Sequence, residues 1–152
     1  IIIVPKEIDK AVNKEDGLNL NWLEAHKTAL IINELKPDKA IIDCPSPNIK
    51  KYKKYLLNLL NNKKIELVVE HRAEKHMPVA AASVMAKVIA EEQLKKLKKS
   101  LKIEFGSGYT SDPHTQKFVK ENFDKHPEIF RKSWSTWKNY DNAKKQHKLD
   151  EF

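Results

Sequence analysis

The chain has 152 residues and one cysteine, and its 29 lysine and arginine residues outnumber its 21 aspartate and glutamate residues, which gives a net charge of +8. This length is typical of one domain with a buried core, so we expect residues 1–152 to form a single domain. One cysteine excludes a disulfide framework and a cysteine-based zinc cluster. No apolar stretch is long enough to cross a membrane and no signal-peptide pattern is present, so we expect a cytoplasmic protein.

Strand and helix patterns alternate along the chain. A β-branched run at residues 1–4 predicts a strand or strand end, and Pro5 can begin a short helix. The same reasoning predicts further elements in chain order: a helix at 19–35, a strand at 39–43, a helix at 48–59, a strand at 64–70, a helix at 78–97, and helices after Asp112 and around Trp134. The small side chains at 79–83 would let their helix pack closely against a sheet. This order implies parallel strands joined by helices, an α/β fold.

The positive charge is concentrated in the last two thirds of the sequence. Residues 1–47 carry 6 basic and 8 acidic side chains, whereas residues 48–152 carry 23 basic and 13 acidic ones. Such an excess favours a polyanionic partner, of which nucleic acid is the commonest. Lysine-rich helix faces that only keep a protein soluble would give the same composition, so charge alone leaves both interpretations open.

Two carboxylates follow successive predicted strands. Asp43 ends one strand, and Glu74 lies just beyond the next. In open parallel sheets, ligands bind at the carboxyl ends of the strands, and carboxylate oxygens suit Mg²⁺ or Mn²⁺ ions that activate water in phosphodiester hydrolysis. A structural interpretation is also open at this point, in which Asp43 caps the turn through Pro45 and Glu74 pairs with Arg72 or Lys75.

Other reactive side chains give weaker signals. The histidines lack the spacing of a zinc site, and His71 and His76, which flank Glu74, either assist proton transfer or are simply exposed. Cys44 has no neighbouring group that would activate it, so we expect a small buried thiol.

A glycine-rich loop lies between the predicted helices of the second half. It consists of Gly106, Ser107, Gly108 and Tyr109. Glycine allows close approach of a sugar-phosphate chain, and a tyrosine ring can stack on a base or sugar. The alternative is an ordinary tight turn with the tyrosine packed inward.

Four segments together resemble type 2 ribonucleases H, most closely the archaeal ribonuclease HII group. They are DCPSPN at 43–48, EHRAE at 70–74, VAAASVMAK at 79–87 and GSGYTSDP at 106–113. The segments LNLNWLEA at 18–25 and RKSW at 131–134 are similar to that group as well. The order of these segments over most of the chain, rather than any single one, carries the resemblance.

The resemblance implies a ribonuclease H-like fold, a mixed sheet flanked by helices, with a C-terminal helical extension over residues 113–152. It also implies a metal-dependent endonuclease that uses Mg²⁺ or Mn²⁺. Such an enzyme cuts the RNA strand of RNA–DNA hybrids and cuts at single ribonucleotides in duplex DNA, leaving 3′-hydroxyl and 5′-phosphate ends.

The resemblance also assigns site residues. Asp43 falls at the family's third active-site carboxylate and Glu74 at its fourth, so both are expected to be catalytic and to bind metal. The fourth carboxylate is usually aspartate in type 2 enzymes, and a glutamate there is closer to the type 3 enzymes.

Substrate contacts are implied for the glycine-rich loop and for one helix. Tyr109 falls where the family's tyrosine stacks on the deoxyribose beside the ribonucleotide, and Gly106, Ser107 and Gly108 belong to the same loop. Ser83 and Lys87 lie on the helix that borders the family's active site and are expected to contact the substrate backbone.

One family motif has no match. Members carry an early strand with the sequence Asp-Glu-Ala-Gly-Arg-Gly, which supplies the first two carboxylates and reads the 2′-hydroxyl, and residues 1–20 contain nothing similar. We therefore expect half of a four-carboxylate site here, with the other half supplied by a separate N-terminal ribonuclease H fragment or by further sequence. The alternative is a non-catalytic nucleic-acid-binding module derived from a ribonuclease H.

Overall fold

The computed structural model describes residues 1–150, except for the side chains of 144, 145 and 147–150. The chain forms two compact units. The first, called the sheet unit, comprises residues 1–2 and 16–89, and the second, called the helical unit, comprises residues 3–15 and the chain from Ala90 on. Within residues 1–150, no helix combines the length and the apolar character needed to cross a membrane.

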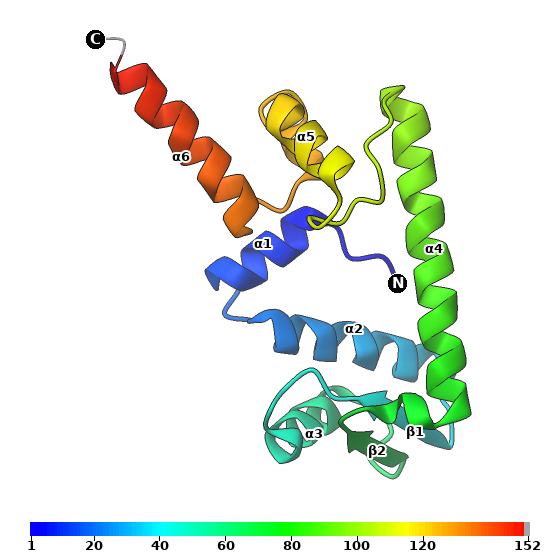
Figure 1. Cartoon of the computed structure of the whole chain (residues 1–152). Helices are drawn as coiled ribbons and strands as arrows, with labels where there is room; N and C mark the ends of the chain where they lie inside the picture. The colour runs from blue at the N-terminus through cyan, green and yellow to red at the C-terminus, as the bar shows by residue number, and fades with distance from the viewer. Residues whose placement is uncertain (151–152) are drawn as a thin grey trace. The chain divides into compact units, whose positions relative to one another are not determined.

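The sheet unit is built around two parallel strands (Figure 1). Its elements are α2 (Leu20–Leu35), β1 (Lys39–Asp43), α3 (Ile49–Leu59), β2 (Glu66–Glu70), the single-turn 3-10 helix η1 (Ala73–Lys75) and α4 (Met77–Leu101) as far as Ile89. Parallel strands need a crossover connection, and α3 supplies it between β1 and β2. The predicted α/β class and both predicted strands are therefore confirmed, although β2 begins two residues later than predicted.

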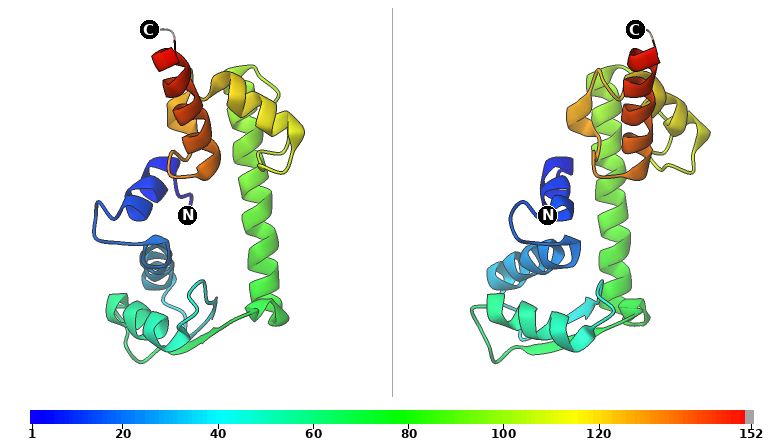
Figure 2. Two further views of the ribbon diagram at one scale, coloured as in Figure 1. Left: turned by 60° about the vertical axis from the view of Figure 1, so that its left-hand side comes forward. Right: turned by 90° about the vertical axis from the view of Figure 1, so that its left-hand side faces the viewer.

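The core of the sheet unit lies between α2, α3 and one face of the sheet. Tyr52 and Leu56 of α3 are completely buried there, and α3 packs against α2, beside which it lies in both views of Figure 2. Side chains alternate along a strand, so one face of the sheet points into this core. The residues of that face are Ala40, Ile42, Leu67 and Val69. Cys44 joins the same cluster, which confirms the expected buried thiol.

Local sequence signals explain the ends of these helices. Asn19 accepts a hydrogen bond from the Trp22 backbone at 3.0 Å and so begins α2, and Asn48 does the same for Lys51 at 2.9 Å at the start of α3. Asparagine is among the best N-cap residues, because its side chain satisfies one of the free N–H groups of the first turn.

The first half of α4 differs from the prediction. Its small side chains were expected to pack against the sheet, yet α4 has no buried residue in the described chain, and Val84 and Met85 are 61% and 65% exposed. Small side chains permit close packing, but they do not show whether the chain has a surface that packs against them. The sheet unit therefore presents an uncovered apolar helix face.

Residues 1–4 also differ from the prediction, because they form no strand. The backbone at Val4 is extended, with φ −82° and ψ 154°, but it serves as the N-cap of α1 (Pro5–Asn13). An extended β-branched run becomes a strand only where another strand can pair with it, and none does so within the described chain.

The helical unit carries the predicted C-terminal helical extension. Besides α1 and the second half of α4, it contains α5 (Pro113–Asn122), the 3-10 helix η2 (Pro127–Ile129) and α6 (Ser135–Asp150). Phe105 and Phe118 stack at 4.7 Å in its core. Asp9 of α1 accepts hydrogen bonds from the backbone N–H groups of Lys132 at 3.0 Å and Ser133 at 2.9 Å. Residues 151–152 of the predicted extension lie outside the described residues.

Candidate active site

The carboxyl ends of β1 and β2 form the edge of the sheet where the predicted carboxylates lie. Asp43, the last residue of β1, is directly opposite Glu70, the last residue of β2. The Cys44 backbone N–H donates a hydrogen bond of 2.8 Å to the Glu70 carbonyl, which continues the pairing one residue beyond β1. This pairing fixes where the chain leaves both strands.

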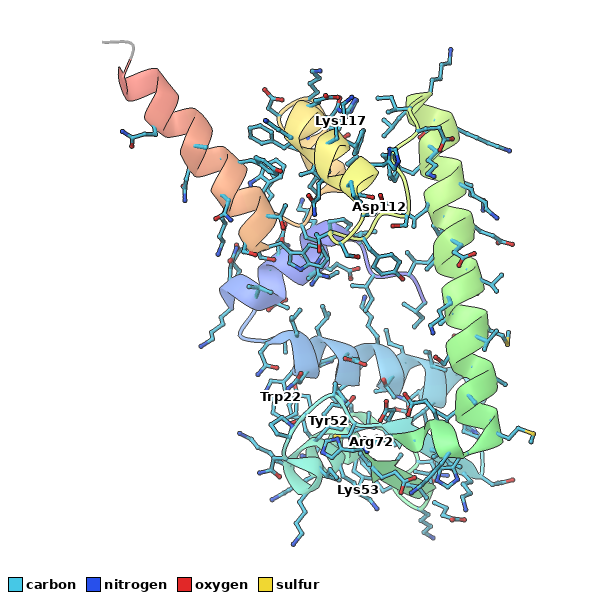
Figure 3. The ribbon with its side chains drawn as sticks, viewed as in Figure 1. Trp22, Tyr52, Lys53, Arg72, Asp112 and Lys117 are labelled. Atoms are coloured by element: carbon cyan, nitrogen blue, oxygen red, sulfur yellow. The ribbon has the colours of Figure 1, made fainter. Side chains whose placement is uncertain are left out.

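The turn after β2 folds back onto the end of β1. Arg72, labelled in Figure 3, has a left-handed backbone with φ 55°, which reverses the chain. The Ala73 N–H donates a hydrogen bond of 3.4 Å to the Asp43 carboxylate, and a ring nitrogen of His71 lies 3.2 Å from the Cys44 carbonyl. Because Glu74 follows Ala73 in η1, the structure brings Asp43 and Glu74 to the same edge of the sheet.

Glu70 holds the other end of this turn. Its carboxylate pairs with Lys75 at 3.0 Å and with His76 at 2.5 Å. Hydrogen bonds from these two residues lower the pKa of Glu70. Lys75 is therefore bound to Glu70 rather than to Glu74, contrary to the structural interpretation of the sequence. Glu74 itself is exposed and has no ion pair within the described residues.

Asp43 does cap a turn, but it is the turn at Ala73 after β2 and not the expected turn through Pro45. Its bond to Ala73 is long and uses only one of its two carboxylate oxygens. A carboxylate has about four lone-pair sites, so this bond leaves acceptor positions for a ligand. The structural and the ligand-binding interpretations of Asp43 are therefore compatible.

Glu24 of α2 is a carboxylate at this edge that the sequence did not single out. Desolvation and the negative charge of Asp43 raise the pKa of Glu24. Burial is the main cause that raises the pKa of Tyr52 to about 12, and the negative charge of Glu24 adds to it. Glu24 lies within residues 18–25, one of the segments that resemble the ribonuclease HII group, so this resemblance could have drawn attention to Glu24.

The carboxylates of the described residues do not complete a metal site. Their oxygens are of the type that Mg²⁺ and Mn²⁺ prefer, but no three His, Cys, Asp or Glu side chains gather closely enough within residues described by the structure to hold an ion. A metal site at Asp43 and Glu74 would therefore need ligands from outside the residues that the structure describes.

The glycine-rich loop lies in the helical unit, before α5. Gly106 and Gly108 have φ values of +72° and +80°, which side chains rarely adopt. The Asp112 carboxylate accepts hydrogen bonds from the N–H groups of Ser107 at 2.6 Å and His114 at 2.9 Å, so one side chain closes the loop and caps α5. Gly108 donates to Thr115 at 3.0 Å.

Tyr109 projects from this closed loop and is 68% exposed. The alternative of a tyrosine packed inward is therefore wrong. The remaining predicted contact residues, Ser83 and Lys87, lie on the sheet-unit half of α4, where Ser83 is half-buried and Lys87 is exposed. Asp43, Glu74, Ser83 and Lys87 thus belong to the sheet unit and Tyr109 to the helical unit.

Comparison with known protein families identifies the chain. The family model described as Ribonuclease HII matches residues 2–137. The chain belongs to the ribonuclease HII family. The resemblance seen in the sequence is therefore confirmed, and with it the enzyme class, ribonuclease H.

Individual relatives agree with ribonuclease HII. The chain is 36% identical to a ribonuclease HII of Pyrococcus furiosus, over 100% of this chain and 69% of that protein. It is 40% identical to one of Thermofilum pendens, over 90% of this chain and 67% of that protein. The chain therefore spans about two thirds of the length of these relatives.

Solved ribonuclease HII structures have the same fold. The crystal structure of ribonuclease H2 from Pyrococcus horikoshii matches with a TM-score of 0.79 and 32% identity, over 94% of this chain and 67% of that one. A complex of PCNA with RNase HII from Archaeoglobus fulgidus matches with a TM-score of 0.74 and 32% identity, over 88% of this chain and 64% of that one. The predicted ribonuclease H-like fold is confirmed.

Gly106→Ala tests how tightly the loop is closed. A Cβ atom at Gly106 would collide with the Asp112 carboxylate, whereas one at Gly17, which has the same φ of +72°, would meet nothing within 4 Å. Both substitutions impose the same unfavourable backbone conformation, so Gly17→Ala is the matched control. We expect Gly106→Ala to lower the melting temperature clearly more, and equal losses in the two variants would contradict the collision.

The pKa of Asp112 provides a second test of the loop. Hydrogen bonds from Ser107 and His114 lower the pKa of Asp112 from 3.8 to about 2. The carboxylate therefore stabilises the fold above about pH 4, and this contribution is lost as the pH falls through about 2. A carboxyl NMR titration should give a midpoint near 2 and a higher midpoint in Ser107→Ala. A wild-type midpoint near 3.8 would show that the loop is not closed in this way.

Proposed function

We propose that this chain provides the third and fourth carboxylates of a metal-dependent endonuclease. The enzyme would cut the RNA strand of RNA–DNA hybrids and cut at single ribonucleotides in duplex DNA. The observation that carries the proposal is that Asp43 and Glu74 share one edge of the sheet in a chain of the ribonuclease HII family. We also propose that the enzyme acts in the cytoplasm.

Asp43 and Glu74 would donate oxygen ligands to Mg²⁺ or Mn²⁺. Such an ion, when bound, supplies an activated water and stabilises the leaving oxygen in phosphodiester hydrolysis. Mg²⁺ demands near-octahedral geometry and keeps several waters, so two carboxylates bind it weakly. Further carboxylates are needed, and we propose that a second segment of a ribonuclease H, with the motif that residues 1–20 lack, supplies them.

Features of the surface of the sheet unit favour the proposal that a second segment binds to it. Both strands are edge strands, since the sheet of the described chain has only β1 and β2. An unpaired strand edge is a template for another strand. Apolar side chains are also exposed on α2, where Leu30 and Leu35 are 56% and 72% exposed, and on α4 around Val84. Such surfaces usually mark an interaction site.

Substrate contacts are proposed for the residues that the resemblance assigned. Tyr109 would stack on a sugar beside the ribonucleotide, while the loop formed by Gly106, Ser107 and Gly108 would lie against the sugar-phosphate chain. The exposure of Tyr109 and the rigidity that Asp112 gives its loop support this role. Ser83 and Lys87 would contact the backbone of the substrate from α4.

PCNA is a proposed protein partner. The support is the Archaeoglobus fulgidus RNase HII, whose structure is that of a complex with PCNA. Co-elution of this chain with an archaeal PCNA in gel filtration would support the partner, and separate elution at micromolar concentrations would contradict it.

A complementation assay tests the proposed catalytic role. The substrate is duplex DNA with one ribonucleotide, and the chain is assayed with Mn²⁺, alone and together with the part of the Pyrococcus furiosus relative that lies outside the match. We expect cutting on the 5′ side of the ribonucleotide only in the mixture. Asp43→Asn should lower the rate by at least ~100-fold, because loss of groups that merely support metal ligands already costs 10–100-fold.

Two controls complete the assay. EDTA should abolish cutting, and Asp16→Asn, on a loop residue, should leave the rate unchanged. Metal-independent cutting, or full activity of Asp43→Asn in the mixture, would contradict the proposal. Salt-sensitive binding without any cutting in the mixture would favour a non-catalytic binding module instead.

A further inference from the structure

Helix α3 has an unusual charge distribution. Four of its eleven residues are lysines, at positions 50, 51, 53 and 54, and none is acidic. Tyr52 and Leu56 are completely buried on the opposite side, while Lys50, Lys51 and Lys54 are exposed and Lys53 is half-buried. Lys53, Trp22 and Tyr52 are labelled in Figure 3.

This distribution does not stabilise the helix. Lys50 and Lys51 lie in the first turn of α3, where positive charge opposes the helix dipole. Lys50 and Lys54 are four residues apart, a spacing at which like charges repel. No carboxylate pairs with Lys50, Lys53 or Lys54 among the residues that the structure describes. An anionic partner would remove each of these unfavourable terms.

The helix surface is also held rigidly. Lys51 lies over the Trp22 ring, 5.7 Å from its centre, and Trp22 stacks on Tyr55 at 4.2 Å. The Tyr55 hydroxyl in turn lies 3.0 Å from a ring nitrogen of His26. These contacts link α3 to α2, and the core that Tyr52 and Leu56 share with Leu67 packs α3 against the sheet.

The position of α3 connects these lysines to the candidate active site. Only residues 44–48 separate Asp43 from α3, so the helix begins at the edge of the sheet where Asp43 and Glu74 lie. Eleven residues of α helix span about 16 Å at 1.5 Å per residue. Phosphates on one strand of a duplex are about 3.4 Å apart along its axis, so α3 could follow several of them away from the cleavage point.

We propose that the outer face of α3, formed by Lys50, Lys53 and Lys54 and called the α3 lysine face, binds the phosphate backbone of the duplex substrate to one side of the cleavage point. This inference rests on the proposed function and adds a second contact surface to the glycine-rich loop. It assigns α3 a role in affinity and not in sequence recognition, because phosphate contacts carry no base information.

The test compares two triple variants with the same change in charge. Lys50→Gln/Lys53→Gln/Lys54→Gln removes the α3 lysine face, while Lys117→Gln/Lys120→Gln/Lys125→Gln removes three lysines in and just after α5. Glutamine is a good helix former, so both variants should fold, which circular dichroism verifies. Binding of duplex DNA with one ribonucleotide is measured by fluorescence anisotropy over a range of KCl concentrations in EDTA, which separates binding from cutting.

We expect the salt dependence of the DNA-binding affinity to decrease in the α3 variant and to change little in the α5 variant. Each phosphate contact adds about one unit to the slope of log affinity against log salt, so the α3 variant should lose about three units and the α5 variant less than about one. Replacing the same three α3 lysines with arginine should retain the wild-type slope.

Other outcomes separate the possible failures. Wild-type-like binding by the α3 variant would overturn the inference while leaving the proposed function intact, and would point to an acidic protein as the partner of this face. Equal losses in the two triple variants would also overturn it, because the effect would then come from net charge. No binding by the wild-type chain would overturn the α3 inference and count against the proposed function as well.

Discussion

The parallel pairing of β1 with β2 is the constraint on which the site depends. Asp43 and Glu70 form the last residue pair of the two strands, and the hydrogen bond from the Cys44 N–H to the Glu70 carbonyl extends the pairing by one residue. Both chain exits therefore lie at one edge, where the Ala73 N–H reaches the Asp43 carboxylate. A shift of one residue in this pairing would move every strand side chain to the opposite face, so the buried Leu67 and the position of Asp43 are specified together.

The electrostatics of this edge follow from that geometry. The Glu70 carboxylate pairs with Lys75 and His76, whose hydrogen bonds lower the pKa of Glu70. These bonds hold the turn that contains Glu74 against the end of β2. Burial, together with the negative charge of Asp43, raises the pKa of Glu24. A metal site at this edge would need ligands from outside the described chain, which is why a second segment is central to the proposed function.

Local signals were enough to predict most elements, but not their partners. β1, the start of α2 after Asn19 and the start of α5 at Pro113 followed from a β-branched run, an asparagine and a proline. Residues 1–4 and the first half of α4 were predicted wrongly, because strand formation and helix burial depend on a facing surface that local sequence does not specify. At the site, strand order predicted that Asp43 and Glu74 share an edge. The nearness of Glu24 to Asp43 could not be predicted in this way, because it depends on how α2 packs across the sheet.

The most direct test of the shared edge is paramagnetic broadening by Mn²⁺ in NMR spectra of the chain. If Asp43 and Glu74 converge, low concentrations of Mn²⁺ should broaden the amide signals of residues 43–44 and 73–74 together, even though binding is weak. Asp43→Asn should then remove the broadening at both segments. Broadening of only one segment, or unchanged broadening around Glu74 in Asp43→Asn, would contradict the account that these carboxylates form one half of a metal site.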